Sequence, residues 1–414
     1  MSSTLRATLP TLLALLCGYA LMQMGNTLQG TLLSVRGHLG GFTATEIGAV
    51  GAAFWVGIVL GSLWAGRAIQ QVGHTRAFAA LAAVAASTAL LHLLVIEPAV
   101  WIGARAVTGF CFAGLFIVVE SWLNAAATPS TRGQILGLYG MTGLIAGIGG
   151  QMLLPTSSPA GFQLFCLVAM LICLALVPVA LSRASAPAHA VGEARIDLRR
   201  LYRLSPFGVV AAILCGITTS SFFALGPVWA TARGLDTTGI AIFMACGTLG
   251  GFATTWPLGW ISDRMDRRHV IVGTAAMASV ILLALVNFVP PGGPLWLLCL
   301  YVAIFGGSVI PTYSIVIAHV NDMVAPGQFV AAAGGLLILQ GIGAAAGPVI
   351  AGMAMQEFGR MGLPYTIIAA QALMVLWGAY RSLRRPSPAA KEQFVPEPVV
   401  PVGTELAPAH AGAS

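Results

Sequence analysis

The sequence predicts an all-α membrane protein with twelve transmembrane helices, arranged as two pseudo-symmetric halves of six helices each. Of its 414 residues, 57% are hydrophobic and only 8% are charged, whereas charged residues make up about 25% of an ordinary soluble domain. The apolar residues gather in twelve runs that are long enough to cross the hydrocarbon core of a bilayer. Similar short motifs also recur in the two halves of the chain.

Each expected span has about 20 residues or slightly more, because a helix rising 1.5 Å per residue must cross ~30 Å of hydrocarbon. An even number of spans places both termini on the same side of the membrane. In chain order, the expected spans are residues 10–35, 46–66, 76–96, 99–124, 132–154, 161–182, 207–231, 238–261, 269–289, 295–320, 328–353 and 363–383.

The longest internal connection divides the chain into its halves. Residues 183–206 are rich in Ala and Pro and then basic, which is typical of a cytoplasmic linker. We therefore expect an N-terminal six-helix half at residues 1–182 and a C-terminal six-helix half at residues 207–383. Residues 384–414 are rich in Pro and Ala and are expected to form a disordered cytoplasmic tail.

The basic residues predict the orientation of the chain. Sixteen of the 20 Arg and Lys residues lie at the termini and in the loops on the same side, three lie in the opposite loops, and Arg105 lies within a span. The positive-inside rule then places both termini in the cytoplasm of a multi-pass protein of the bacterial inner membrane. The same asymmetry explains the net charge of +7 without a nucleic-acid partner.

The internal repeat indicates a duplicated architecture. AGRAIQQVGHTR (65–76) corresponds to SDRMDRRHV (262–270), and Gly109 lies opposite Gly306 in the second half. A duplication of this kind suits a secondary transporter, in which the halves rock about a central site and expose it to each side in turn. A membrane sensor or scaffold that carries no cargo is the alternative of another class.

The stretch GWISDRMDRRHV (259–270) resembles the cytoplasmic signature of the major facilitator superfamily, Gly-x-x-x-Asp-Arg-x-Gly-Arg-Arg, although Asp266 replaces its second Gly and the first-half copy has Gly66 in place of the Asp. The resemblance covers residues 10–383 and implies that superfamily's fold. It also implies a conformational latch, in which charged groups bond across the cytoplasmic gap and to each other. A solvated charge run that only fixes topology would look similar. The latch residues would be Asp263, Arg264, Arg267 and Arg268.

Further stretches carry a narrower resemblance. RAVTG (105–109) resembles the superfamily's fourth-helix signature, which is associated with proton coupling. VVESWLN (118–124), GLYGMTG (137–143) and LCGITTSSFFALGPVWA (214–230) are similar to bacterial permeases of the YcaD type, and proposed riboflavin importers are similar to these. The resemblance implies a transporter and points to riboflavin as its cargo.

Arg105 and Glu120 are charged residues within one expected span. Fifteen residues place them about 22 Å apart along a helix and roughly 60° apart around it, so they share a face but do not pair with each other. Because a charge facing lipid costs on the order of several kcal/mol, this face should meet the central cavity or a partner helix. Glu120 is the only acidic residue well inside a span, which makes it the proton-coupling candidate. A Glu bonded to Ser121, Trp122 or a neighbouring helix is the structural alternative.

Polar residues on several spans predict a cargo site. Tyr19, Gln23, Asn26 and Gly30 follow one face of the first span, with i, i+4, i+7 and i+11 spacing. Amides, hydroxyls and aromatic rings with little charge suit an uncharged, planar, hydrogen-bonding solute such as riboflavin, and many neutral drugs would fit as well. The expected substrate-binding residues are Tyr19, Gln23, Asn26, Arg105, Gln151, Ser221, Phe222 and Gln340.

The composition argues against an enzyme, a metal site and a cofactor. Lys391 is the single lysine, so the membrane domain contains neither a nucleotide-binding loop nor a lysine for a Schiff base. No Asp lies in a span, and the seven His residues show no metal-binding spacing. We therefore predict a monomeric secondary transporter, with lipid, riboflavin and the coupling proton as its partners. Its leading function is riboflavin uptake, and proton-coupled export of drugs or metabolites is the alternative.

Overall fold

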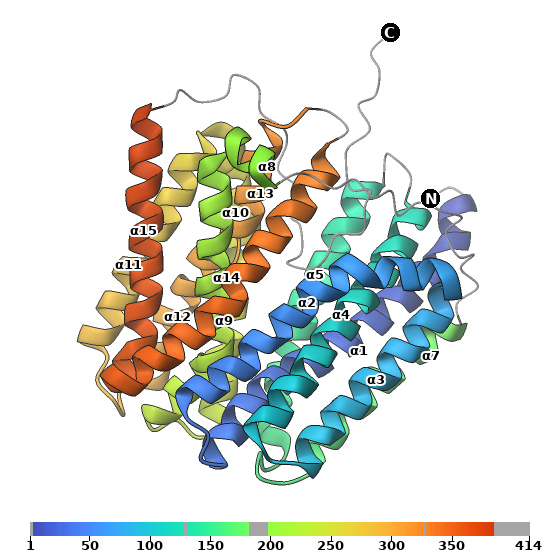
Figure 1. Cartoon of the computed structure of the whole chain (residues 1–414), viewed down its shortest axis with the longest axis horizontal. Helices are drawn as coiled ribbons and strands as arrows, with labels where there is room; N and C mark the ends of the chain where they lie inside the picture. The colour runs from blue at the N-terminus through green and yellow to red at the C-terminus, as the bar shows by residue number, and fades with distance from the viewer. Residues whose placement is uncertain (1–2, 128–130, 182–197, 326–327, 385–414) are drawn as a thin grey trace.

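The computed structural model describes residues 3–127, 131–181, 198–325 and 328–384, and all regular secondary structure in this part of the chain is helical (Figure 1). Its first part contains α1 (Ser3–Leu39), α2 (Ala44–Val72), α3 (His74–Leu94), α4 (Pro98–Ala126), α5 (Arg132–Met152), a 3₁₀ turn (Leu154–Thr156), α6 (Gln163–Leu174) and α7 (Leu176–Leu181). The second part contains α8 (Leu198–Leu204), α9 (Pro206–Ala232), α10 (Thr237–Arg264), α11 (Arg267–Phe288), α12 (Leu295–Val309), α13 (Thr312–Asn321), α14 (Phe329–Phe358), a 3₁₀ turn (Gly359–Met361) and α15 (Gly362–Arg384).

The predicted membrane bundle is confirmed. Each of the twelve expected spans coincides with one helix, or with one of the consecutive pairs α6–α7 and α12–α13. Within the described residues, ten helical segments are long and apolar enough to cross a membrane, and one of them, Ala331–Arg384, runs through both α14 and α15. α1 contains the first expected span.

Prolines explain both broken spans. A proline lacks the N–H that would bond the carbonyl four residues earlier, which weakens a helix at that point. Pro178 accounts for the end of α6 at Leu174, and Pro311 for the break between α12 and α13. The carbonyl of Gly307, which Pro311 leaves without a helical partner, instead accepts a hydrogen bond at 2.7 Å from the Thr254 hydroxyl of α10. A neighbouring helix thereby satisfies a backbone group that lipid could not.

The two halves lie side by side, with α1–α7 in one and α8–α15 in the other (Figure 1). We call the end of the bundle at which α1 begins and α15 ends the terminal end, and the opposite end the far end. Of the expected linker 183–206, the described part includes α8, whereas residues 182–197 and the expected tail 385–414 lie outside the described residues.

Glycines at corresponding positions allow close helix packing in both halves. A Cβ atom on Gly109 of α4 would overlap the backbone oxygen of Phe54 in α2, and a Cβ on Gly306 of α12 would overlap that of Gly247 in α10. Close approach of backbones through small residues is how helices associate within lipid. The two glycines that the sequence repeat aligned therefore have the same packing role.

Candidate functional site

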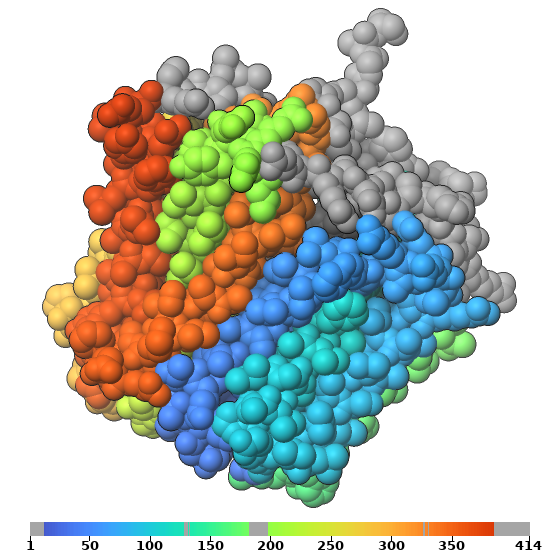
Figure 2. Space-filling model, viewed as in Figure 1, coloured from blue at the N-terminus to red at the C-terminus, as the bar shows by residue number. Residues whose placement is uncertain are grey.

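A cavity of about 820 Å³ lies between the halves and is lined by both of them. α1, α2, α4 and α5 form its wall in the first half, and α9, α10, α13 and α14 contribute to it in the second. Helices α2 and α14 meet beside it along a diagonal seam, which Figure 2 shows as the line where the blue and orange surfaces touch.

The two halves contact each other toward the far end of the cavity. The Ser34 hydroxyl of α1 donates a hydrogen bond to the backbone oxygen of Ala224 in α9. Near the start of α2, a Cβ on Gly48 would overlap the backbone oxygen of Pro348 in α14. We call the contacts formed by Ser34, Ala224, Gly48 and Pro348 the far seal.

Six of the eight expected substrate-binding residues line the cavity. All four residues of the expected α1 face are on its wall, and Gln151 is held there by a hydrogen bond of 2.6 Å from the Thr31 hydroxyl. The six residues are Tyr19, Gln23, Asn26, Arg105, Gln151 and Gln340.

Ser221 and Phe222 are not among the lining residues. Ser221 faces Gly347 of α14, and Phe222 packs in an aromatic cluster with Phe243 and Phe305. Thr219, Ser220 and Phe223 line the cavity in their place. The expected residues miss the wall by one position because successive helical residues turn by about 100°, and every face of this apolar helix looks alike in sequence.

Amide groups on the cavity wall have polar atoms without protein partners. Within the described residues, neither polar atom of the Gln340 side chain has a hydrogen-bond partner, and the same holds for Gln23 Oε1 and Asn26 Oδ1. The Gln340 side chain is fully buried, at 0% exposure. A buried polar group without a partner costs about 1–3 kcal/mol, so these amides would gain from a hydrogen-bonding solute that reached them.

Glu120 lies outside the cavity wall, next to it. Its carboxylate, which is 2% exposed, accepts a hydrogen bond at 3.2 Å from the Tyr139 hydroxyl of the neighbouring helix α5. The Tyr139 ring in turn packs against Tyr19, with 4.2 Å between ring centroids, and Tyr19 lines the cavity. Two tyrosines therefore connect the carboxylate to the cavity.

Arg105 lies on the wall nearer the far end. Its Nη1 donates a hydrogen bond at 3.0 Å to Gln29 Oε1, and its guanidinium stacks 4.2 Å from the centre of the Phe54 ring. Of the two charged residues that the sequence placed on one face of α4, Arg105 lines the cavity and Glu120 does not.

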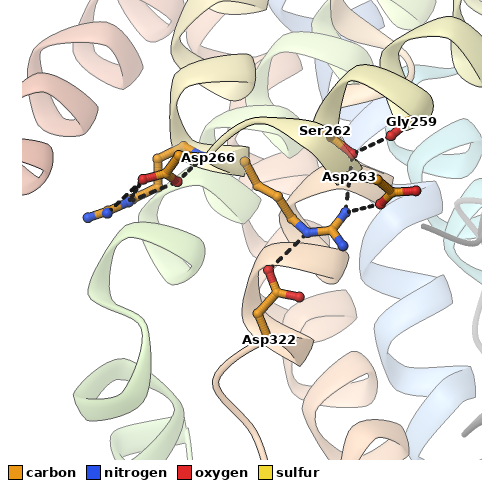
Figure 3. Close-up of polar contacts among 7 residues, drawn as sticks. Gly259, Ser262, Asp263, Asp266 and Asp322 are labelled. Carbon is orange, nitrogen blue, oxygen red and sulfur yellow. Dashed lines mark hydrogen bonds and ion pairs between the residues drawn. The ribbon is translucent and has the colours of Figure 1, made fainter. Parts of the chain in front are cut away.

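The expected latch residues form ion pairs within the second half (Figure 3). Arg267, which is 1% exposed, pairs with Asp263 at 3.1 Å and with Asp322 at 2.9 Å, so that the two carboxylates lie on either side of its guanidinium. Arg268 pairs with Asp266 at 2.8 Å. Arg264 is exposed and stacks on Trp260, with 3.8 Å between its guanidinium carbon and the ring centre.

Asp322 is a partner that sequence reasoning missed. It follows α13 and joins that helix to the α10–α11 connection through Arg267. The available signal was a carboxylate at the end of the tenth span, on the same side of the membrane as the basic motif. The sequence alone does not show which helix ends are neighbours, so the pair could not be assigned.

Comparison with known proteins identifies the family. Relatives of similar length include an uncharacterized MFS-type transporter of Yersinia pestis (strain Pestoides F), 26% identical over 373 residues that cover 88% of this chain and 94% of the relative. The uncharacterized MFS-type transporter YcaD of Salmonella typhi is 24% identical over 381 residues, covering 91% and 97%. These relatives agree with the YcaD-type resemblance and do not bear on riboflavin.

Solved structures share the fold. The nucleoside transporter NupG has a TM-score of 0.72 at 15% identity, covering 92% of this chain and 99% of its own. A D-xylose–proton symporter has a TM-score of 0.68 at 14% identity, covering 92% and 98%. The family model described as "Major Facilitator Superfamily" matches residues 15–334 and 253–408. The chain is a transporter, not an enzyme, and it belongs to the Major Facilitator Superfamily.

Proposed function

We propose that this secondary transporter takes up a planar, hydrogen-bonding solute by alternating access, and that riboflavin is its leading cargo. The observation that carries the proposal is the set of unpartnered amide atoms, at Gln23 and Asn26 in the first half and at Gln340 in the second. A cargo that bonds amides of both halves would be bound most tightly when the halves close around it, which is what alternating access requires.

The rest of the wall supports a planar cargo with little charge. Aromatic rings of Phe54, Trp55 and Phe223 line the cavity, and such rings stack on planar heterocycles. Arg105 is the one charged side chain among the described lining residues, whereas a multiply charged anion would call for several cations. Nucleosides also combine a planar base with hydroxyl groups, so they are the natural competitors to test beside riboflavin.

The far seal and the charge distribution together suggest which way the cavity faces. If the terminal end lies in the cytoplasm, as the Arg and Lys residues predict, the far seal closes the periplasmic side and the described conformation is inward-facing. Ser34 and Gly48 would then separate from the second half each time the transporter accepts cargo from outside.

Proton-coupled export is the second candidate. The connection from Glu120 through Tyr139 to Tyr19 favours it, because a buried carboxyl group next to the cargo space can couple its protonation to the presence of cargo. An importer could use the same carboxyl group, so the direction of transport must be measured.

The test is growth of a bacterial riboflavin auxotroph that lacks its own importer, on low external riboflavin, with and without this chain. Uptake of labelled riboflavin is measured in the same cells, with unlabelled riboflavin or uridine as competitor. Rescue with saturable uptake is expected. Absence of rescue, with the protein shown to be in the membrane, would remove the riboflavin proposal and place export first. Binding without accumulation in proteoliposomes would indicate a sensor.

A further inference from the structure

Arg105 is a buried cation without a carboxylate partner in the part of the chain that the structure describes. Its side chain is 6% exposed, and within the described residues no carboxylate lies at ion-pairing distance from it. One amide oxygen, from Gln29, and the face of the Phe54 ring are its contacts. A charge in a low-dielectric interior is costly unless it is paired and fully hydrogen-bonded, so this guanidinium would gain from an anion.

The guanidinium of Arg105 has N–H groups that are not used in its bond to Gln29. It carries five N–H groups, and the bond from Nη1 to Gln29 uses one of them. Nη2 lies beside Gly30, where a Cβ atom would be 3.7 Å away, and both Gly30 and Arg105 line the cavity. The glycine therefore leaves an approach to Nη2 that a larger side chain would obstruct.

The side-chain amide of Gln29 is a second, independent observation at the same place. This residue is fully buried, and while its Oε1 accepts the bond from Arg105, its Nε2 has no partner within the described residues. The amide thus satisfies the cation and leaves its own donor unpaired. Both Arg105 and Gln29 therefore have N–H donors that an acceptor on a bound solute could satisfy.

We propose that Arg105, approached past Gly30, forms an oxyanion subsite of the cavity that takes a single carboxylate or phosphate group on an aromatic solute. The inference rests on the proposed function only in taking the cavity as the cargo site. Asn26 and Gln23 lie about 6 Å and 10 Å from Gly30 along the axis of α1. An aromatic body anchored at Arg105 would therefore reach their amides. A neutral cargo would offer a carbonyl oxygen to the same donors and would bind less tightly than its anionic counterpart.

Paired probes that differ in charge test the subsite. The full chain in lipid nanodiscs is titrated at pH 7 by calorimetry with 2-naphthoate and with its neutral isostere 2-naphthamide. Riboflavin 5′-phosphate and riboflavin form a second pair, which separates phosphate from carboxylate recognition. We expect at least one anion to bind about tenfold more tightly than its neutral partner, as is typical of a hydrogen bond to a charged group. Equal affinities within both pairs would overturn the proposal.

Variants test whether the preference for the anionic probe depends on Arg105 and on the access that Gly30 leaves to it. Arg105→Gln should bring the affinity ratio of the pair close to one, whereas Arg105→Lys should retain part of it. Gly30→Val keeps the guanidinium with its Gln29 and Phe54 contacts but obstructs Nη2, so it should lower the ratio even if Arg105→Gln does not fold. Asn26→Ala should weaken both probes and leave the ratio unchanged. A ratio that survives both Arg105→Gln and Gly30→Val would contradict the proposal.

The experiments distinguish failure of the oxyanion subsite from failure of the riboflavin proposal. Wild-type protein that prefers the anionic probe but does not take up labelled riboflavin keeps the subsite and removes that cargo. Protein that takes up riboflavin but binds charged and neutral probes equally keeps the cargo and removes the subsite.

Discussion

The hydroxyl of Ser34 in α1 donates a hydrogen bond to the backbone oxygen of Ala224 in α9 at 2.7 Å, and this bond joins the two halves of the transporter. The two residues are 190 positions apart in the chain. Gly48 and Pro348 make a second contact between the halves, backbone against backbone. The far seal therefore includes one hydroxyl and one residue without a side chain.

Gly48→Val should keep the far seal from closing, because any Cβ at this position overlaps the Pro348 oxygen. The cavity should then be open from the far end for a larger share of the time. The measurement is the labelling rate of Asn26→Cys in cells by a membrane-impermeant maleimide, relative to the same protein without that cysteine. Gly103→Val is the matched control, since a Cβ there meets no atom within 4 Å. Equal labelling in the two valine variants would refute a role of Gly48 in the seal.

Gln340→Leu should abolish uptake without lowering stability. Both polar atoms of this buried amide lack partners among the described residues, so an apolar side chain removes a cost of about 1–3 kcal/mol while it removes a proposed cargo contact. The thermal unfolding midpoint without cargo should stay level or rise. Gln371→Leu is the control, because the Gln371 amide donates to the Thr218 hydroxyl at 2.9 Å and its loss should lower the midpoint. A lower midpoint for Gln340→Leu would mean that this amide has a structural partner.

Glu120→Gln should abolish accumulation driven by a proton gradient while exchange of labelled for unlabelled cargo continues. The amide oxygen can still accept the Tyr139 hydrogen bond, but the side chain no longer carries a proton on and off. Both activities are measured in proteoliposomes. Tyr139→Phe separates the two roles, since it removes the bond and leaves the carboxyl group. Unchanged accumulation in Glu120→Gln would assign Glu120 a packing role only.

Asp322→Asn should destabilise the second half. It removes one of the two carboxylates that pair with the buried Arg267, and breaking a buried ion pair costs about 3 kcal/mol. The thermal unfolding midpoint of the purified protein measures the effect. Arg264→Gln, at an exposed position of the same motif, should change the midpoint little. If the two variants shifted it equally, the buried pair would not contribute more than the exposed charge.

The helices of this protein were predictable because a membrane-spanning helix can be recognised from the length and hydrophobicity of one continuous stretch of sequence. Any run of about 20 apolar residues meets the requirement by itself, so all twelve expected spans coincide with helices, and prolines mark the two interruptions. The polar face of α1 was also visible, since Gln23 and Asn26 stand out on an apolar helix. The superfamily motif at 259–270 could be recognised from consecutive residues, without knowing which helices pack beside it.

Tertiary packing decided which face of each helix meets the cavity. In α9 every face is apolar or small, so its periodicity could not tell Ser221 and Phe222, which pack against other helices, from Ser220 and Phe223, which line the wall. The same limit applies to partners: Glu120 meets Tyr139 and Arg267 meets Asp322 only because particular helices are neighbours. By itself the sequence determined the spans, the family and most of the polar wall. The structure decided the pairing and the rotation of the helices, because both depend on contacts between residues far apart in the chain.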